Sequence, residues 1–459
     1  MKVNTKLLLS VVIAIIIVVG VLVALLAWPQ PTQQQTTITQ TQSPIEKIVI
    51  RFSGWGAGET EVKNYEKAIS DFSKKYPNIV VKYEPIAQMY HENILASFAG
   101  GAAPDVFYVD SSWAQTFIDL GVLKAIDDIV QDPAKLSALK AQYYDFLLKP
   151  FIGSDGKLYG LPKDWSVLFL AYNKQCLASA GLSSVPDNWN DFFRALEYVT
   201  DKTGKPALVD HYHWRTFVVI ALSYGAPYPD FSSENSVRAW FSNDAVKKAL
   251  KDYMDLYLNG YVKRVEAGKT PYVVLPRDVD SGWGGEAFGK QQACFTFEGS
   301  WMIPFIKDQF PNFKYGDQWD ITLIPKGPAG RYTLAFTVIL GINSKTQHPK
   351  EAFEFVNYVA GVEGQKLLVV SLGHTLPSIK ELASSPDLWP EHRKSLELLN
   401  NYGNVFVWPT MNSTKAGAVI SSIDNIIQSY IARMKDTKTY DFDQLLNDLI
   451  NSVISAIKS

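Results

Sequence analysis

Carboxylates and large aromatic side chains stand close together at several points of this chain. The stretch ACFTFEGSWMIPFI (293–306) shows the pattern clearly, because an alternating β-rich run ends at Glu298, Gly299 and Trp301, before an apolar run with helical potential. A glycine lets the backbone turn and approach a bound molecule closely. A tryptophan ring offers a flat apolar face, and a carboxylate accepts hydrogen bonds from hydroxyl groups. These residue types together predict a binding site for a neutral polyhydroxylated molecule.

Similar combinations recur at the ends of other predicted strands and in nearby loops. The further candidate ligand-binding residues are Trp55, Glu59, Asp110, Ser111, Trp113, Asp164, Trp165, Trp283, His374 and Trp408. Aspartate and tryptophan at strand ends also cap helices or pack beneath loops, so a structural role is the alternative for each residue. For Trp301 the alternative is a place in the core beneath the following helix.

A catalytic role for the carboxylates would need a pair with a defined separation and divergent pKa values. No short motif forces two of Glu59, Asp110, Asp164 and Glu298 into such a pair. A surface glycoside hydrolase is therefore the weaker hypothesis. We predict no catalytic residue and no cofactor.

Two glycine-rich stretches resemble nucleotide-binding motifs but depart from them. GWGAGE (54–59) has Glu59 where a dinucleotide fingerprint has its third glycine, and a carboxylate there would repel a pyrophosphate. GGEAFGKQ (284–291) has Gln291 in place of the hydroxyl-bearing residue of a P-loop. We reject both nucleotide sites.

The histidines and cysteines do not form a recognisable metal motif. On a strand His211 and His213 would face the same side, but no third ligand is in view, so we predict no zinc site. Cys176 and Cys294 lack CxxC spacing. A disulfide between them and two buried free thiols are both open, and free thiols are favoured for a strand cysteine such as Cys294. Asn412 begins an N-glycosylation sequon.

Length and composition are those of a globular protein with two or more lobes. The chain has 459 residues, of which 47% are hydrophobic and 20% charged, and this length exceeds one ordinary core. The formal net charge of −2 gives no basic stripe for nucleic acid. We predict no nucleic-acid partner.

The N-terminus predicts attachment to a membrane. Lys2 and Lys6 precede an uncharged apolar run from Leu7 to Trp28, which is long enough to span a bilayer. We expect residues 1–28 to be an uncleaved anchor or signal, with cleavage after Lys6 as the alternative, and 29–45 to be a Thr/Gln-rich stalk. The predicted location is the extracellular face of the cell membrane, anchored by this transmembrane segment.

Strands and helices alternate after the stalk, which is typical of an α/β fold. The expected strands are 47–52, 79–85, 104–110, 157–162, 167–173, 293–297, 319–325 and 333–343. The expected helices are about 62–76, 93–101, 112–121, 188–200, 240–259, 285–292, 349–361 and most of the chain from 386, with Asp187 or Asn188 as the N-cap of the fourth.

Several stretches resemble one family when read in order. They are 54–84, 94–127, 156–182, 185–192 and FGKQQACFTFEGSW (288–301). From about residue 46 to the C-terminus the chain resembles extracellular solute-binding proteins of the sugar-specific, maltose/trehalose-type branch (family 1), which serve ABC transporters. The N-terminal segment and stalk resemble those of archaeal members.

The resemblance implies a two-lobe, type II periplasmic-binding-protein-like fold with ligand bound between hinged lobes. One lobe would hold 46–163 and 322–372, and the other 166–318 and 374–459. In the family a tryptophan at the position of Trp301 stacks on the sugar, and Trp408 stands where maltose-type members have another stacking aromatic. The resemblance also implies a monomer that hands a mono- or oligosaccharide to permease subunits. A binding protein for another solute, such as a polyamine or peptide, is the alternative.

Overall fold

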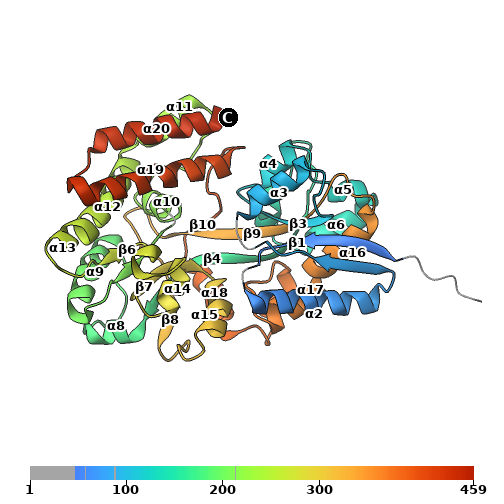
Figure 1. The fold of residues 1–459 in the computed structure, drawn as a ribbon, viewed down its shortest axis with the longest axis horizontal. Coiled ribbons are helices and arrows are strands. Elements are labelled where there is room, and N and C mark those ends of the chain that lie inside the picture. Colours follow the sequence, from blue (N-terminus) through green and yellow to red (C-terminus); the bar gives the residue numbers. More distant parts are fainter. Residues whose placement is uncertain (1–46, 57, 87–88, 212, 459) are drawn as a thin grey trace, which may run out of the picture. The chain divides into compact units, whose positions relative to one another are not determined.

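The computed structural model describes residues 47–56, 58–86, 89–211 and 213–458 (Figure 1). They belong to one compact unit, Lys47–Ser459. Among the described residues, no helix has the length and apolar character that a membrane crossing requires. This finding contradicts the predicted membrane-anchored location. The expected anchor and stalk, 1–28 and 29–45, lie outside the described residues.

Within the described residues, ten strands form one mixed sheet. The strands are β1 (Ile48–Ser53), β2 (Ile79–Tyr83), β3 (Val106–Asp110), β4 (Leu161–Asn173), β5 (Leu208–Val209), β6 (Val273–Val274), β7 (Phe295–Gly299), β8 (Trp319–Thr322), β9 (Tyr332–Ile342) and β10 (Asn404–Val407). Their order is β2-β1-β3-β9-β4-β7-β5-β6, with β10 paired to β9 and β8 paired to β4. The β1–β2, β1–β3, β7–β5 and β5–β6 pairs are parallel, which requires crossover connections of the α/β kind.

The two long strands β4 and β9 connect the two ends of this sheet (Figure 1). The C-terminal part of β9, from Val338, pairs with β3, and its N-terminal part pairs with β10. Up to Val167 β4 pairs with β9, and from Leu168 it pairs with β7. The prediction of two separate strands here was wrong. Lys163 and Asp164 break the apolar pattern, but they lie at a bulge within one continuous strand.

Helices cover the sheet in two groups. Around β1, β2 and β3 lie α2 (Glu59–Lys75), α3 (Tyr90–Ala99), α4 (Ala114–Asp119), α5 (Ile126–Ile129), α6 (Pro133–Ala141), α7 (Asp145–Leu148), α16 (Pro349–Ala360) and α17 (Val362–Gln365). The others are α8 (Lys174–Ser179), α9 (Trp189–Thr203), α10 (His213–Ser223), α11 (Glu234–Ser242), α12 (Asp244–Tyr257), α13 (Lys263–Glu266), α14 (Gly284–Gly289), α15 (Met302–Gln309), α18 (Pro390–Leu399), α19 (Ala416–Thr437) and α20 (Phe442–Lys458).

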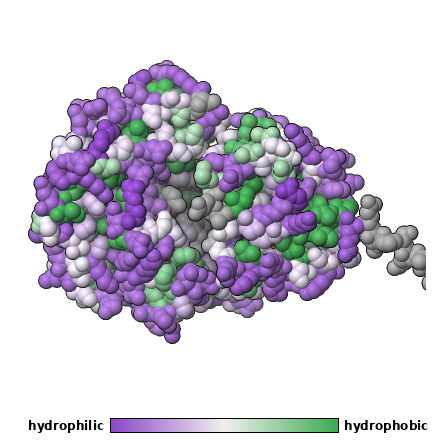
Figure 2. Space-filling view, viewed as in Figure 1, coloured by the Kyte–Doolittle hydropathy of each residue, from purple (hydrophilic) through white to green (hydrophobic). Residues whose placement is uncertain are grey.

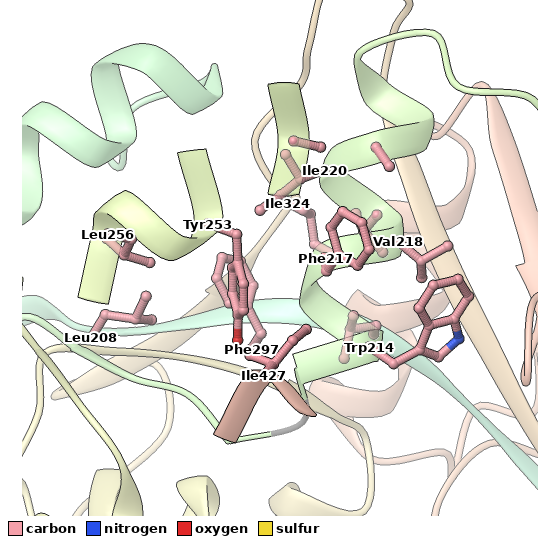
Figure 3. Close-up of a cluster of buried hydrophobic side chains, with 14 of the residues drawn as sticks. Leu208, Trp214, Phe217, Val218, Ile220, Tyr253, Leu256, Phe297, Ile324 and Ile427 are labelled. Carbon is pink, nitrogen blue, oxygen red and sulfur yellow. The ribbon is translucent and has the colours of Figure 1, made fainter. Parts of the chain in front are cut away.

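Each group of helices shares a large hydrophobic core with its strands. The first core includes Phe52, Tyr65 and Phe355, which pack as tilted or edge-to-face rings. In the second core, α10, α12 and α19 direct Phe217, Tyr253 and Ile427 toward the strands β5 and β7 (Figure 3). Separate cores on one sheet are what a chain of this length needs, because a single core does not keep growing with chain length.

Local signals explain several element boundaries. α9 begins after Asn188, whose side-chain oxygen accepts from the Asp191 N–H at 3.0 Å, and it ends at Gly204 in the left-handed region. This confirms one of the two predicted caps. His213 begins α10, so His211 and His213 do not share a strand face, which was the condition for considering them as metal ligands. The hydrophobic run after His213 is buried on all sides, so it has no amphipathic helical signal.

The two cysteines form a disulfide between α8 and the residue before β7. Cys176 and Cys294 are 118 residues apart in sequence, with their Cα atoms 5.7 Å apart. The preference for free thiols was therefore wrong. The cysteines come together because β7 pairs with β4, and β4 leads directly into α8.

Candidate functional site

The candidate site contains a row of directly paired residues on three neighbouring strands, β3, β9 and β4. Asp110 of β3 and Asp164 of β4 both pair with Val338 of β9. Directly paired residues of neighbouring strands carry their side chains on the same face of a sheet. Phe336 and its partner Ser166 share that face, two residues along each strand. The register therefore joins carboxylates and an aromatic ring in one surface.

Asp110 is held by a histidine and a serine. Its Oδ2 lies 2.9 Å from His91 Nε2, and its Oδ1 accepts from the backbone N–H of Ser112 at 2.7 Å. Burial alone would raise the pKa of Asp110, but His91 and the Ser112 hydrogen bonds outweigh it and lower that pKa below its ordinary value. Asp110 is thus a carboxylate at neutral pH.

Aromatic rings surround this carboxylate. Trp113 stacks on the His91 ring with centroids 4.9 Å apart and planes 11° apart. Trp55 meets Tyr108 edge-on at 5.3 Å and His91 at 6.4 Å. Three sequence candidates, Trp55, Asp110 and Trp113, therefore meet around His91, which was not among the predicted site residues.

Asp164 is buried beside its chain neighbour. Lys163 Nζ donates to Asp164 Oδ2 at 2.6 Å, and both side chains are less than 10% exposed. The ammonium also lies 4.7 Å from the centre of the Tyr108 ring. The buried charges of Lys163 and Asp164 compensate each other where β4 passes from one core to the other.

A second aromatic group lies where β7, β9 and the segment after β10 meet. The Phe336 ring contacts Trp301 edge-on at 4.9 Å and Trp408 at 5.4 Å with a 34° tilt. The three side chains are half-buried. Two candidates separated by about a hundred residues are thus joined through Phe336, which a sequence pattern places only as one residue of a strand.

Glu298 lies behind this aromatic group and is fully buried. Its Oε2 accepts from the indole Nε1–H of Trp301 at 3.1 Å and lies 3.4 Å from an Arg215 guanidinium nitrogen. Burial raises the pKa of Glu298, while Arg215 and the indole oppose that rise. Gly299 allows the close packing, because a Cβ there would lie 2.3 Å from the Trp301 ring.

Other sequence candidates lie apart from these groups. The Glu59 side chain is 89% exposed and pairs with Lys63. Trp165 is buried with its indole N–H donating to Pro377 O at 2.8 Å, on the sheet face opposite Asp164. Trp283 meets Phe305 edge-on at 4.8 Å at the start of α14.

His374 and Ser111 are enclosed by protein groups. His374 Nε2 lies 3.1 Å from the Asn64 amide nitrogen, and its ring meets Tyr65 at 5.5 Å. Burial lowers the pKa of His374 to about 3, with help from the charge of Lys163, so the ring is neutral at pH 7. Ser111 is buried, and its backbone N–H donates to Thr337 O at 3.1 Å.

Four important residues have no distinctive sequence signal. His91 lies in an ordinary helical stretch, Arg215 in an apolar helix, Phe336 in a β-rich strand and Lys163 next to a candidate. His91 is 19 residues from its partner Asp110 and Arg215 is 83 residues from Glu298, so only the fold brings these two pairs together.

The two groups of elements touch beyond the long strands. The Thr60 hydroxyl of α2 donates to Asp308 of α15 at 2.6 Å. A Cβ at Gly417 of α19 would lie 3.2 Å from the Trp113 ring. The space-filling view shows the surface hollowed between the two groups (Figure 2). No cluster of three or more potential metal ligands occurs among the described residues.

Comparison with known proteins gives one family. The model of the bacterial extracellular solute-binding protein family matches residues 47–366. An uncharacterized ABC transporter extracellular-binding protein of Pyrococcus horikoshii is 24% identical over 446 residues, 92% of this chain and 90% of that protein. A multiple sugar-binding protein of Streptococcus mutans is 25% identical over 332 residues, which cover 70% of this chain and 72% of that protein.

The fold also matches solved structures. The ABC substrate-binding protein of Listeria monocytogenes, solved in complex with cycloalternan, superposes with a TM-score of 0.73 over 90% of this chain and 99% of that one, at 17% identity. The two cores joined by β4 and β9 are thus the two lobes of a periplasmic-binding-protein-like fold. The chain belongs to the bacterial extracellular solute-binding protein family.

Proposed function

We propose that the protein binds a mono- or oligosaccharide between its lobes and delivers it to the permease of an ABC transporter. The observation that carries this proposal is the sheet face on which Asp110 and Asp164 flank Val338, with Phe336 between Trp301 and Trp408 beside them. A sugar needs an aromatic surface and polar groups together, because its C–H faces pack on aromatic rings and its hydroxyls need hydrogen-bond partners. The named sugar-binding relative in Streptococcus mutans supports the same ligand class.

The ion pairs of Asp164 and Glu298 favour a neutral ligand. Lys163 lies against Asp164 and Arg215 against Glu298, while Asp110 has His91 and Ser112 as its polar partners. A polyamine would need carboxylates whose charge is not already compensated, whereas a hydroxyl can share a paired carboxylate. We therefore favour a sugar over a polyamine.

We infer that Trp55, His91, Asp110 and Trp113 form the ligand contacts of one lobe. Trp283, Trp301 and Trp408 form those of the other lobe, with Asp164, Ser166 and Phe336 on the crossing strands. Ser111, Trp165 and Gly299 support these contacts from buried positions, and His374 does so from a half-buried one. The exposure of Glu59 and its pairing with Lys63 argue for a surface role.

Binding would close the lobes about the crossing strands. The lobe boundaries near 163/166, 318/322 and 372/374 stay a prediction, as does the monomeric state. The contacts of Thr60 with Asp308 and of Trp113 with Gly417 fit a closed form, because each joins elements of different cores. A ligand with contacts to both lobes favours that form.

Calorimetric titration of the purified protein with maltose, raffinose, other oligosaccharides and spermidine tests the proposal. We expect saturable binding of one sugar at about 1 µM or below, equivalent to about −8 kcal/mol, with little dependence on salt. The Trp301→Ala variant should lose at least about tenfold in affinity, while Tyr198→Ala, an exposed aromatic on α9, should not. Binding of spermidine alone, with strong salt dependence, would overturn the sugar assignment.

A further inference from the structure

We propose that Glu298 is a positioning residue, which fixes the ring of Trp301 for the ligand and does not contact the ligand itself. This inference rests on the proposed function, because it concerns a ring that we assign to sugar binding. It changes the role that the residue type suggested, since a carboxylate beside a tryptophan reads in the sequence as an acceptor for hydroxyl groups.

The surroundings of Glu298 separate its carboxylate from the sheet face. The side chain is 0% exposed. Oε2 is taken by the Trp301 indole N–H at 3.1 Å and by Arg215 at 3.4 Å. Oε1 faces the backbone of Gly284, where a Cβ would lie only 2.7 Å away. A sugar hydroxyl would have to displace protein on either side to reach these oxygens.

The Trp301 ring is fixed at both ends. Its nitrogen end is bonded to Glu298, and its six-membered ring lies over Gly299, where a Cβ would come within 2.3 Å of Cζ3. Phe336 meets the ring edge-on, with an interplanar angle of 85°. A tryptophan side chain has only two rotatable bonds, so a hydrogen bond at one end and packing at the other define its orientation.

The hydrogen bond also decides what Trp301 can offer. Its only donor, the indole N–H, is used by Glu298, so the ring is left with its apolar surface for a ligand. A donor bonded to a carboxylate forms a charge-assisted bond, which is stronger than a neutral one. Electron density drawn toward the ring strengthens its negative face and thus its attraction for sugar C–H groups.

Arg215 offsets the free-energy cost of burying the Glu298 carboxylate. It is itself 3% exposed and donates to the Phe297 carbonyl at 2.5 Å, so it is anchored to the same strand as its partner. A buried charge without a counter-charge is costly, whereas a paired one can keep its ionised form. Arg215, Glu298 and Trp301 thus form a chain that runs from the second core to the sheet face.

A double-mutant cycle tests the indirect role. The variants are Glu298→Met, which removes the acceptor at similar volume, Glu298→Gln, which keeps a carbonyl acceptor, and Trp301→Phe, which keeps a ring without the N–H. Affinity is measured for the member of a maltose and raffinose panel that the native protein binds more tightly. We expect Glu298→Met to weaken binding about tenfold and Glu298→Gln to recover part of that loss.

The decisive comparison is the Trp301→Phe background. There Glu298→Met should change affinity less than about twofold, because the bond it removes no longer exists. An equal loss in both backgrounds would overturn the proposal, since Glu298 would then act on the ligand directly or through the fold.

A measurement without ligand separates this inference from the proposed function. In protein labelled with ¹⁵N-tryptophan, the Trp301 indole resonance is identified by its absence in Trp301→Phe. We expect that resonance to move upfield in Glu298→Gln, while the other indole resonances stay in place. An unmoved resonance would overturn the positioning role even if sugar binds. A moved resonance in a protein that binds no sugar would sustain the positioning and reject the sugar function.

Discussion

Asp110 and Asp164 lie on opposite sides of Val338, because β3 and β4 both pair with β9 at that residue. One carboxylate belongs to the end of a strand of the first core, and the other to a strand that runs on into the second core. Their separation is two strand spacings, roughly 10 Å. The site therefore has a polar floor that continues across the connection between the lobes.

Replacing Asp110 by Asn should weaken sugar binding. The amide keeps the size of the carboxylate but loses its charge and one acceptor, and it leaves His91 Nε2 without its carboxylate partner. We expect about a tenfold loss of affinity by calorimetry. Asp145→Asn, whose side chain is 94% exposed, is the matched control and should bind as the native protein does. Equal affinities for both variants would remove Asp110 from the site.

Breaking the disulfide should lower stability without changing affinity. The bond closes a long loop between Cys176 and Cys294, and cross-links over long loops contribute about 2 to 5 kcal/mol. The double variant Cys176→Ala/Cys294→Ala should unfold at lower denaturant concentration by this amount. Its sugar affinity should stay within about twofold, because α8 lies away from β9 and β10 (Figure 1). A loss of sugar affinity with unchanged stability would contradict a purely stabilising role of the disulfide.

Asp424 should make stability fall as pH rises. Burial raises its pKa from 3.8 to about 7, with Asp210 adding to the rise, and the Trp214 N–H and Arg215 partly opposing it. The folded state then holds the proton more tightly than the unfolded state. This contribution to stability is complete below about pH 4 and is lost toward pH 7, at about 1.4 kcal/mol per pH unit.

Denaturant unfolding at pH 5 and pH 8 measures this effect. Asp424→Asn keeps an oxygen for the Trp214 N–H but does not titrate, so its stability relative to the native protein should rise from pH 5 to pH 8. Asp436→Asn, an exposed site on α19, should follow the native protein at both pH values. If the stability of Asp424→Asn also follows that of the native protein at both pH values, Asp424 is not the group that causes the pH dependence.

A larger side chain at Gly417 should hinder lobe closure. Even a Cβ would lie 3.2 Å from the Trp113 ring, so a valine must push α4 and α19 apart. We expect Gly417→Val to weaken sugar binding more than Gly417→Ala does. Small-angle scattering in saturating sugar should give a larger radius of gyration for Gly417→Val than for the native protein. Equal radii and affinities would mean that this contact is not part of the closed form.

Much of the fold could be predicted from local patterns, because its strands and amphipathic helices are long and periodic. The α2 helix and the strands β1, β2, β3 and β9 lie close to their expected positions. The two-residue strands β5 and β6 and the short β10 were missed, since so few residues carry no periodicity. Asn243 was also missed as a cap that separates α11 from α12 within an expected single helix.

The partners in the site could not be predicted in this way. Trp301 and Trp408 were selected from their residue types, but Phe336, which joins them, lies in the middle of a strand like any core aromatic. Lys163 and Asp164 seemed to interrupt a strand, whereas their mutual ion pair lets β4 continue through a buried environment. Such pairings depend on tertiary contacts that leave no local signal.

A crystal structure of the protein with its tightest-binding sugar tests the central claim most directly. We predict a sugar ring against Trp301 and Trp408, with hydroxyl groups within hydrogen-bond distance of Asp110 or Asp164 and contacts to both lobes. A sugar bound elsewhere, or held by one lobe without either tryptophan, would contradict it.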